Sequence, residues 1–123
     1  MEPEVRQKLD KAHEVRINGS YDEAEPLYRE VLEQVSDPVE EAETRHGLGL
    51  TLVLTGMFDE GLKELVRAHE RDPDHAGILL ELAKTHLMLG LYDEAQPELE
   101  QIAERFPDTP EAEEARKQLS YFE

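Results

Sequence analysis

The chain has 123 residues, of which 35% are charged and 38% hydrophobic, so it is long enough for one domain with one core, and we expect a single domain over residues 1–123. Its formal net charge of −17, with 30 acidic residues against 13 Lys and Arg, argues against nucleic-acid binding, because phosphates are neutralised by clustered cations. The absence of cysteine excludes disulfides, thiolate metal sites and cysteine nucleophiles.

The N-terminal residues are acidic and include no apolar stretch, so we expect no signal peptide. The longest apolar run, near residues 48–54, is too short to cross a bilayer, and we expect no membrane association. Together these features predict a soluble cytoplasmic protein.

Three similar segments recur along the chain, beginning at Gly19, Gly56 and Gly90. Two residues after each glycine comes an aromatic residue, which Asp-Glu follows directly, and each segment is followed by a proline-containing turn. The spacing predicts three repeat units, at about residues 5–38, 39–75 and 76–109. In each unit the glycine is expected to end one helix in a left-handed conformation, and the following Asp is expected to cap the next helix.

A small residue lies five positions after each turn glycine and is expected to let two antiparallel helices approach closely: Ala24, Gly61 and Ala95. Apolar residues recur between the turns at helical spacing, as expected for helices that bury one face. The units therefore predict pairs of packed helices.

The residue pattern resembles the tetratricopeptide repeat (TPR) family over about residues 5 to 109. The first unit matches through Ala12, Tyr21, Ala24 and Tyr28, although Lys11 occupies the leucine position. The second unit matches through Leu48, Gly49, Leu52, Phe58, Leu65, Ala68 and Pro73, with Gly61 in place of the usual alanine. The third matches through Leu82, Ala83, Tyr92, Ala95, Leu99, Ile102 and Pro107, with His86 in place of a large apolar residue. The resemblance implies an all-α fold, a right-handed α-solenoid of three TPR helix hairpins plus a C-terminal capping helix.

The capping helix is expected at about residues 110–122. One stripe of this segment is apolar, as a helix covering the exposed end of a repeat array requires: Ala112, Ala115, Leu119 and Phe122. An alternative is that Tyr121 and Phe122 dock into a neighbouring molecule.

The resemblance implies that the first helix of each pair lines a concave surface. The inner positions are Arg6, Leu9, His13, Arg16 and Ile17 in the first unit, Glu43, His46, Leu50, Val53 and Leu54 in the second, and Gly77, Leu80, Lys84, Leu87 and Met88 in the third. This set is rich in aliphatic residues and holds three permanent cations and two histidines against one acid. It predicts an apolar, weakly basic groove for an amphipathic or hydrophobic peptide with some acidic character.

The predicted function is a protein–protein interaction module, an adaptor or scaffold that binds a peptide or helix of another protein. One alternative is a self-assembling homo-oligomer whose groove is filled by another copy, and a second is a regulatory subunit of an enzyme encoded elsewhere. A third alternative is that the aliphatic residues at the inner positions belong to the ordinary core. The TPR clamp that binds chaperone C-termini is disfavoured. Among the positions of this chain that match the clamp, only Lys84 keeps the positive charge.

Catalytic and metal chemistry find little support in the sequence. His13 and His46 fall on adjacent inner helices, and His69 and His75 lie at one turn, but neither set has a recognised ligand spacing. The serines have no base beside them that the sequence identifies. We expect no enzyme activity, no metal and no cofactor.

Overall fold

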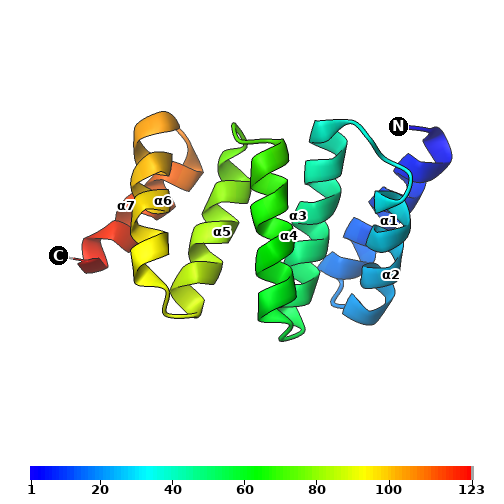
Figure 1. The fold of residues 1–123 in the computed structure, drawn as a ribbon, viewed down its shortest axis with the longest axis horizontal. Coiled ribbons are helices and arrows are strands. Elements are labelled where there is room, and N and C mark those ends of the chain that lie inside the picture. The colour runs from blue at the N-terminus through cyan, green and yellow to red at the C-terminus, as the bar shows by residue number, and fades with distance from the viewer. Residues whose placement is uncertain (123) are drawn as a thin grey trace. The chain divides into compact units, whose positions relative to one another are not determined.

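The computed structural model describes residues 1–122 and consists of seven α-helices and a final 3₁₀ helix in that range (Figure 1). Their bounds are α1 Pro3–Ile17, α2 Tyr21–Leu32, α3 Pro38–Leu54, α4 Phe58–Arg71, α5 Ala76–Met88, α6 Tyr92–Arg105, α7 Pro110–Leu119 and η1 Ser120–Phe122. None of the helices described is both long and apolar enough to cross a membrane. The all-α fold of repeated helical hairpins predicted from the sequence is confirmed.

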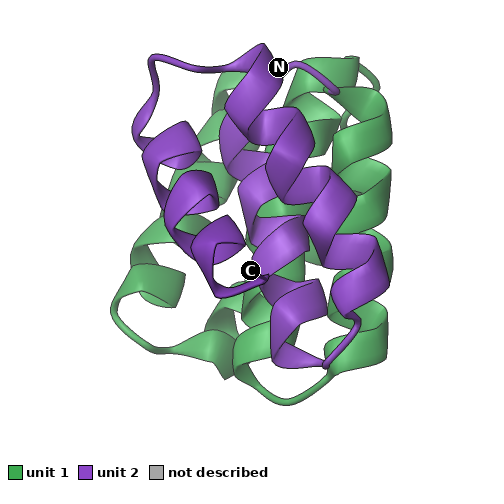
Figure 2. Ribbon diagram, turned by 90° about the vertical axis from the view of Figure 1, so that its left-hand side faces the viewer, with its two compact units in different colours: residues 1–72 green, residues 73–123 purple. Residues whose placement is uncertain are grey.

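The helices divide into two compact units, residues 1–72 with α1 to α4 and residues 73–123 with α5 to η1 (Figure 2). In unit 1, α1 packs on α2, α2 on α3 and α3 on α4. Its main apolar cluster joins the first three helices, and the buried members are Val5, Leu9, Ala12, Val15, Ala24, Tyr28, Val31, Leu48 and Leu52.

The turns inside the hairpins are closed by glycines in the left-handed region, as predicted. The φ angles of Gly19, Gly56 and Gly90 are +87°, +87° and +76°. In the first turn, the Gly19 amide donates to the carbonyl of Arg16 at 2.9 Å and the Ser20 amide donates to the carbonyl of Val15 at 2.8 Å. This pair of bonds is the Schellman motif, which satisfies the last carbonyls of the helix.

The predicted Asp caps of the second helices are wrong. Helices α2, α4 and α6 begin at the aromatic residue itself, and the residues before it, Ser20, Met57 and Leu91, make no side-chain capping bond. The reason is that the residue after each glycine both completes the Schellman motif and begins the next helix. The Asp residues therefore lie in the first helical turn, where a carboxylate favourably faces the positive end of the helix dipole.

The starts of α3, α5 and α7 are capped by side chains, whereas Glu2 before α1 makes no side-chain capping bond. Asp37 accepts a hydrogen bond from the Glu40 amide at 3.0 Å at the start of α3, and Thr109 accepts one from the Ala112 amide at 3.1 Å at the start of α7. At α5 the cap is the Nδ1 atom of His75, which accepts from the Ile78 amide at 3.1 Å.

Helices α3 and α4 cross with backbone close to backbone at Gly49 and Gly61. A Cβ atom built on Gly61 would lie 2.9 Å from the carbonyl oxygen of Gly49 and 2.7 Å from Cγ2 of Val53. The same approach holds from the other side, since a Cβ on Gly49 would lie 2.8 Å from Cγ of Leu65. The predicted close approach of the two helices is present, and here it leaves no space for the alanine that TPR sequences usually have.

In unit 2, helix α6 packs on both α5 and α7. The buried side chains are Ile78, Leu79, Leu82, Ala83, Thr85 and His86 on α5, Ala95, Leu99 and Ile102 on α6, and Ala112 and Ala115 on α7. His86, which replaces an apolar residue of the family pattern, is accommodated because its Nδ1 lies 2.7 Å from the Glu98 carboxylate. Burial raises the pKa of Glu98, while the hydrogen bond from His86 opposes the rise.

Candidate functional site

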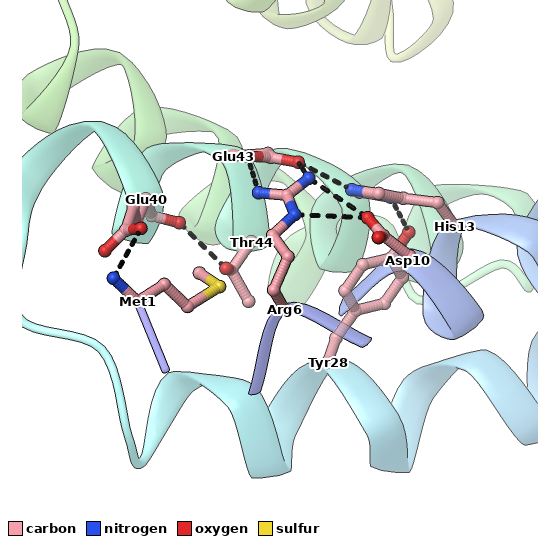
Figure 3. Close-up of polar contacts among 8 residues, drawn as sticks. All are labelled: Met1, Arg6, Asp10, His13, Tyr28, Glu40, Glu43 and Thr44. Carbon is pink, nitrogen blue, oxygen red and sulfur yellow. Dashed lines mark hydrogen bonds and ion pairs between the residues drawn. The ribbon is translucent and has the colours of Figure 1, made fainter. Parts of the chain in front are cut away.

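A chain of polar contacts connects α1, α2 and α3 on the predicted inner surface of unit 1 (Figure 3). Arg6 donates two hydrogen bonds to the Glu43 carboxylate, at 3.0 and 2.8 Å. The Nε2 atom of His13 lies 3.0 Å from the Glu43 carboxylate, and the Nδ1 atom of His13 lies 2.6 Å from the Tyr28 hydroxyl. Arg16 donates from Nε to the same hydroxyl at 2.9 Å. Three of the predicted groove residues, Arg6, His13 and Arg16, therefore connect α1 to α2 and α3.

The titration of this network follows from its contacts. The hydrogen bond from Arg6 is the main reason that the pKa of Glu43 lies below its ordinary value. The same hydrogen bond raises the pKa of Arg6. Burial raises the pKa of the Tyr28 phenol, and the Arg16 guanidinium beside it opposes the rise.

The cations of the predicted groove each contact a partner within their own unit. The charge of Arg6 is neutralised by Glu43, the one acid among the predicted positions, and Arg16 is engaged with Tyr28. In unit 2, Lys84 is exposed and lies 3.8 Å from Glu81. The number of cations could be read from the sequence, but their contacts within their own unit could not.

The predicted place of Leu9 in the groove is wrong, because its side chain is fully buried in the core of unit 1. The reason is that α1 is covered by both α2 and α3, which encloses the stripe of α1 that contains Val5, Leu9 and Ala12. Leu9 therefore contributes to stability and is not available to a ligand.

The remaining apolar positions of unit 1 reach the surface. Leu50 and Val53 are half-buried on α3. Ile17 and Leu54, the last residues of α1 and α3, are 73% and 56% exposed. His46 is half-buried on α3. The unit thus presents aliphatic side chains at the ends of both of its first helices.

Unit 2 has the corresponding surface on α5. Leu80 and Leu87 are half-buried, and Met88, the last residue of the helix, is 56% exposed. We call Ile17, Leu54 and Met88 the hairpin-end aliphatics, because each closes the first helix of a hairpin two residues before the turn glycine.

Unit 2 also contains a pocket that the inner positions alone did not predict. It has a volume of about 460 Å³ and is lined by Leu87, Tyr92, Gln118, Tyr121 and Phe122; we call it the terminal pocket. Phe122 forms one side by packing edge-on against Tyr92, with ring centroids 6.2 Å apart. The sequence offered Tyr121 and Phe122 as residues that dock into a neighbouring molecule. In the structure Phe122 packs against Tyr92 of the same chain, while Tyr121 is 71% exposed.

The histidines form no candidate metal centre in the part of the chain that the structure describes, where no group of three or more potential ligands comes together. His69 and His75 lie at the end of α4 and the start of α5, and His75 acts as the helix cap described above.

The fold and this surface define a helical-hairpin repeat protein with apolar side chains left open on its first helices. The sequence profile of the tetratricopeptide repeat matches residues 52–119, more than half of the chain, and the chain belongs to the tetratricopeptide repeat family. No curated protein matches the chain in sequence.

Several solved structures share the fold at low sequence identity. PcrH, in complex with the chaperone binding region of PopD, is 18% identical, with 98% of this chain and 92% of PcrH covered and a TM-score of 0.87. The type III secretion translocator chaperone SycD of Yersinia enterocolitica is 18% identical, with coverage of 98% and 89% and a TM-score of 0.83. The Arabidopsis OM64 TPR domain is 15% identical, with coverage of 97% and 96% and a TM-score of 0.82.

Proposed function

We propose that the chain is a non-catalytic interaction module that binds a segment of another polypeptide through apolar side chains on the first helices of its hairpins. The observation that carries the proposal is the hairpin-end aliphatics, Ile17, Leu54 and Met88, which are all more than half exposed. A single exposed aliphatic residue is ordinary, but the same position left apolar and open in each hairpin is a repeated feature of the surface.

Each unit has its own proposed ligand surface. In unit 1 the half-buried Leu50 and Val53 accompany Ile17 and Leu54, and in unit 2 the half-buried Leu80 and Leu87 accompany Met88. His46 and Lys84 supply polar contacts, while Arg6, His13 and Arg16 act mainly in support of the helices. Two proteins of like fold hold polypeptide segments, since PcrH is bound to the chaperone binding region of PopD and SycD to a peptide of the translocator YopD. The chain has no cysteine, which fits a module acting in the cytoplasm.

A display library of random 12-residue peptides tests the proposal, with the natural sequence as bait. We expect enriched peptides that lose about tenfold or more in affinity when Ile17, Leu54 and Met88 are all changed to Glu, because apolar contacts at a binding surface are replaced by charge. The matched control changes Val39, Met57 and Val66 to Glu, three apolar residues that are also exposed. Equal loss in both triple variants, or no enrichment at all, would refute the proposed surface.

Self-association is the second candidate for covering this surface, and SycD was crystallised as an alternative dimer. The charge of −17 opposes it, because two copies would bring like charges together. Light scattering coupled to size-exclusion chromatography separates the two cases. We expect a monomer whose mass does not change with concentration, whereas a dimer that the same Glu variants dissociate would favour assembly.

A further inference from the structure

The terminal pocket is a concave surface of unit 2 whose walls are mostly aromatic. Leu87 near the end of α5, Tyr92 at the start of α6 and Tyr121 and Phe122 on η1 supply its apolar walls, and Gln118 on α7 supplies one amide. A volume of about 460 Å³ is within the range of pockets that hold a ligand. It is large enough for one or two side chains of a peptide.

Comparison of the three hairpin turns shows what is particular to this pocket. Tyr21, Phe58 and Tyr92 occupy the same position after the turn glycine. Tyr21 and Phe58 are half-buried, whereas Tyr92 is 58% exposed although Phe122 packs against its ring. Two exposed tyrosines, Tyr92 and Tyr121, thus line one hollow, and rigid aromatic side chains of this kind are enriched among the residues that carry binding energy.

Uncompensated negative charge lies directly beside the pocket. A second hollow of about 280 Å³ shares Tyr92 with it and is lined by Gly90, Leu91, Asp93 and Glu94. Asp93 and Glu94 are exposed and make no ion pair within the described residues. The negative charge of Glu94 also acts on Glu98 in the same helix, where it raises the pKa of the Glu98 carboxyl in addition to the effect of burial. A cationic group entering this hollow is therefore attracted.

We propose that the terminal pocket receives an aliphatic or aromatic side chain of a partner polypeptide, and that a neighbouring Lys or Arg of the same segment pairs with Asp93 or Glu94. This inference rests on the proposed function, that the chain binds polypeptides, and it adds the chemistry of the segment. The occupant is basic beside its apolar anchor, which reverses the acidic character expected from the sequence. A second copy of this chain is a poorer occupant because it brings a charge of −17.

The same 12-residue display library provides the probe. We expect the enriched peptides to carry a Phe, Tyr, Leu or Met with a Lys or Arg nearby, and their affinity to fall as salt is added. Tyr121→Glu is expected to weaken binding of a selected, fluorescently labelled peptide about tenfold, and Asp93→Asn with Glu94→Gln about three- to tenfold. Both changes are at exposed positions, and circular dichroism verifies that each variant is folded.

The first hairpin offers a matched control. Asp22 and Glu23 follow Tyr21 as Asp93 and Glu94 follow Tyr92, and they also line a surface hollow, which lacks aromatic residues. Asp22→Asn with Glu23→Gln removes the same charge and is expected to change affinity less than about twofold. Equal losses from the two pairs would mean that only the overall charge acts, and the proposed site would be wrong.

The remaining outcomes separate this inference from the proposed function. Peptides that are weakened by the hairpin-end Glu variants but not by Tyr121→Glu would leave the proposed function standing and overturn the pocket. Enrichment of acidic peptides would overturn the proposed charge preference. A dimer that Tyr121→Glu dissociates would make a second copy the occupant, and a library without any enriched peptide would overturn both proposals.

Discussion

Replacing Gly61 by alanine tests whether the close crossing of α3 and α4 is as tight as the structure indicates. Alanine is the usual TPR residue at this place and a better helix former than glycine, by about 1 kcal/mol. A family consensus would therefore predict a more stable protein. The structure predicts the opposite, because the new Cβ would lie 2.9 Å from the Gly49 carbonyl oxygen and 3.0 Å from the Val53 amide nitrogen.

The magnitude follows from two opposing effects. Both of these contacts are with backbone atoms of α3, so the methyl group is accommodated only if the helices move apart. Overpacking of this kind costs about 1–3 kcal/mol. Because the contacts are with backbone atoms, which do not yield as a flexible side chain does, the upper part of this range, about 2–3 kcal/mol, applies. After subtraction of the gain of about 1 kcal/mol in helix propensity, Gly61→Ala is expected to lower the free energy of unfolding by about 1–2 kcal/mol.

Urea denaturation followed by far-UV circular dichroism measures the effect. The equivalent position in the first hairpin provides a contrast, because Ala24 is already fully buried there and Ala24→Gly should also destabilise, by about 1 kcal/mol or more. The urea dependence of the unfolding free energy should be unchanged by either substitution, so that midpoints are comparable. A Gly61→Ala protein as stable as the natural one, or more stable, would refute the steric argument.

Three further predictions concern charged side chains. Glu43→Gln should cost about 1 kcal/mol at neutral pH, because the Arg6 pair is partly exposed. The depressed pKa of Glu43 means that this stability is present above the ordinary Glu pKa and is lost as pH falls through the folded value, so urea midpoints of variant and natural protein should converge in acid. Arg45→Ala should cost about 2 kcal/mol by removing the 2.5 Å partner of buried Glu64, and Arg45→Met with Glu64→Leu should recover most of the loss in the same assay. For Glu98 the sign is reversed, because its raised pKa makes its contribution to stability greatest below the ordinary Glu pKa and smaller as pH rises through the folded value. Glu98→Gln should therefore gain stability relative to the natural protein as pH rises from the ordinary Glu pKa through the folded value, measured by thermal melts.

The sequence was sufficient for the class of fold because the information lies in local, repeated signals. Gly19, Gly56 and Gly90 end their helices in the left-handed conformation as expected, since few other residues adopt it without cost. The observed starts of the second helices lie two residues before those that the predicted Asp caps imply. The error arose at the Asp residues, because a sequence does not show that one residue completes the glycine motif and also begins the next helix.

The surface was less predictable, because exposure depends on which neighbours cover a helix. The repeat offset placed Ile17, Leu54 and Met88 at exposed ends, but it also placed Leu9 there, which α2 and α3 bury. The contacts of charged side chains were still harder to predict. The offset put Arg6 and Glu43 on the same surface, yet only the three-dimensional arrangement shows a two-point ion pair between residues 37 positions apart.

The short segment after α6 gives one hairpin an individual character. Hairpins built from similar sequences present similar turns, so a repeated turn cannot by itself distinguish one end of the chain from the other. Helix α7 and η1 bring Gln118, Tyr121 and Phe122 against a third turn that otherwise resembles the first two. Under the proposed role of the terminal pocket, binding preference can diverge by substitutions in this C-terminal segment while the hairpins stay unchanged, and grafting the segment onto another repeat protein should transfer the preference with it.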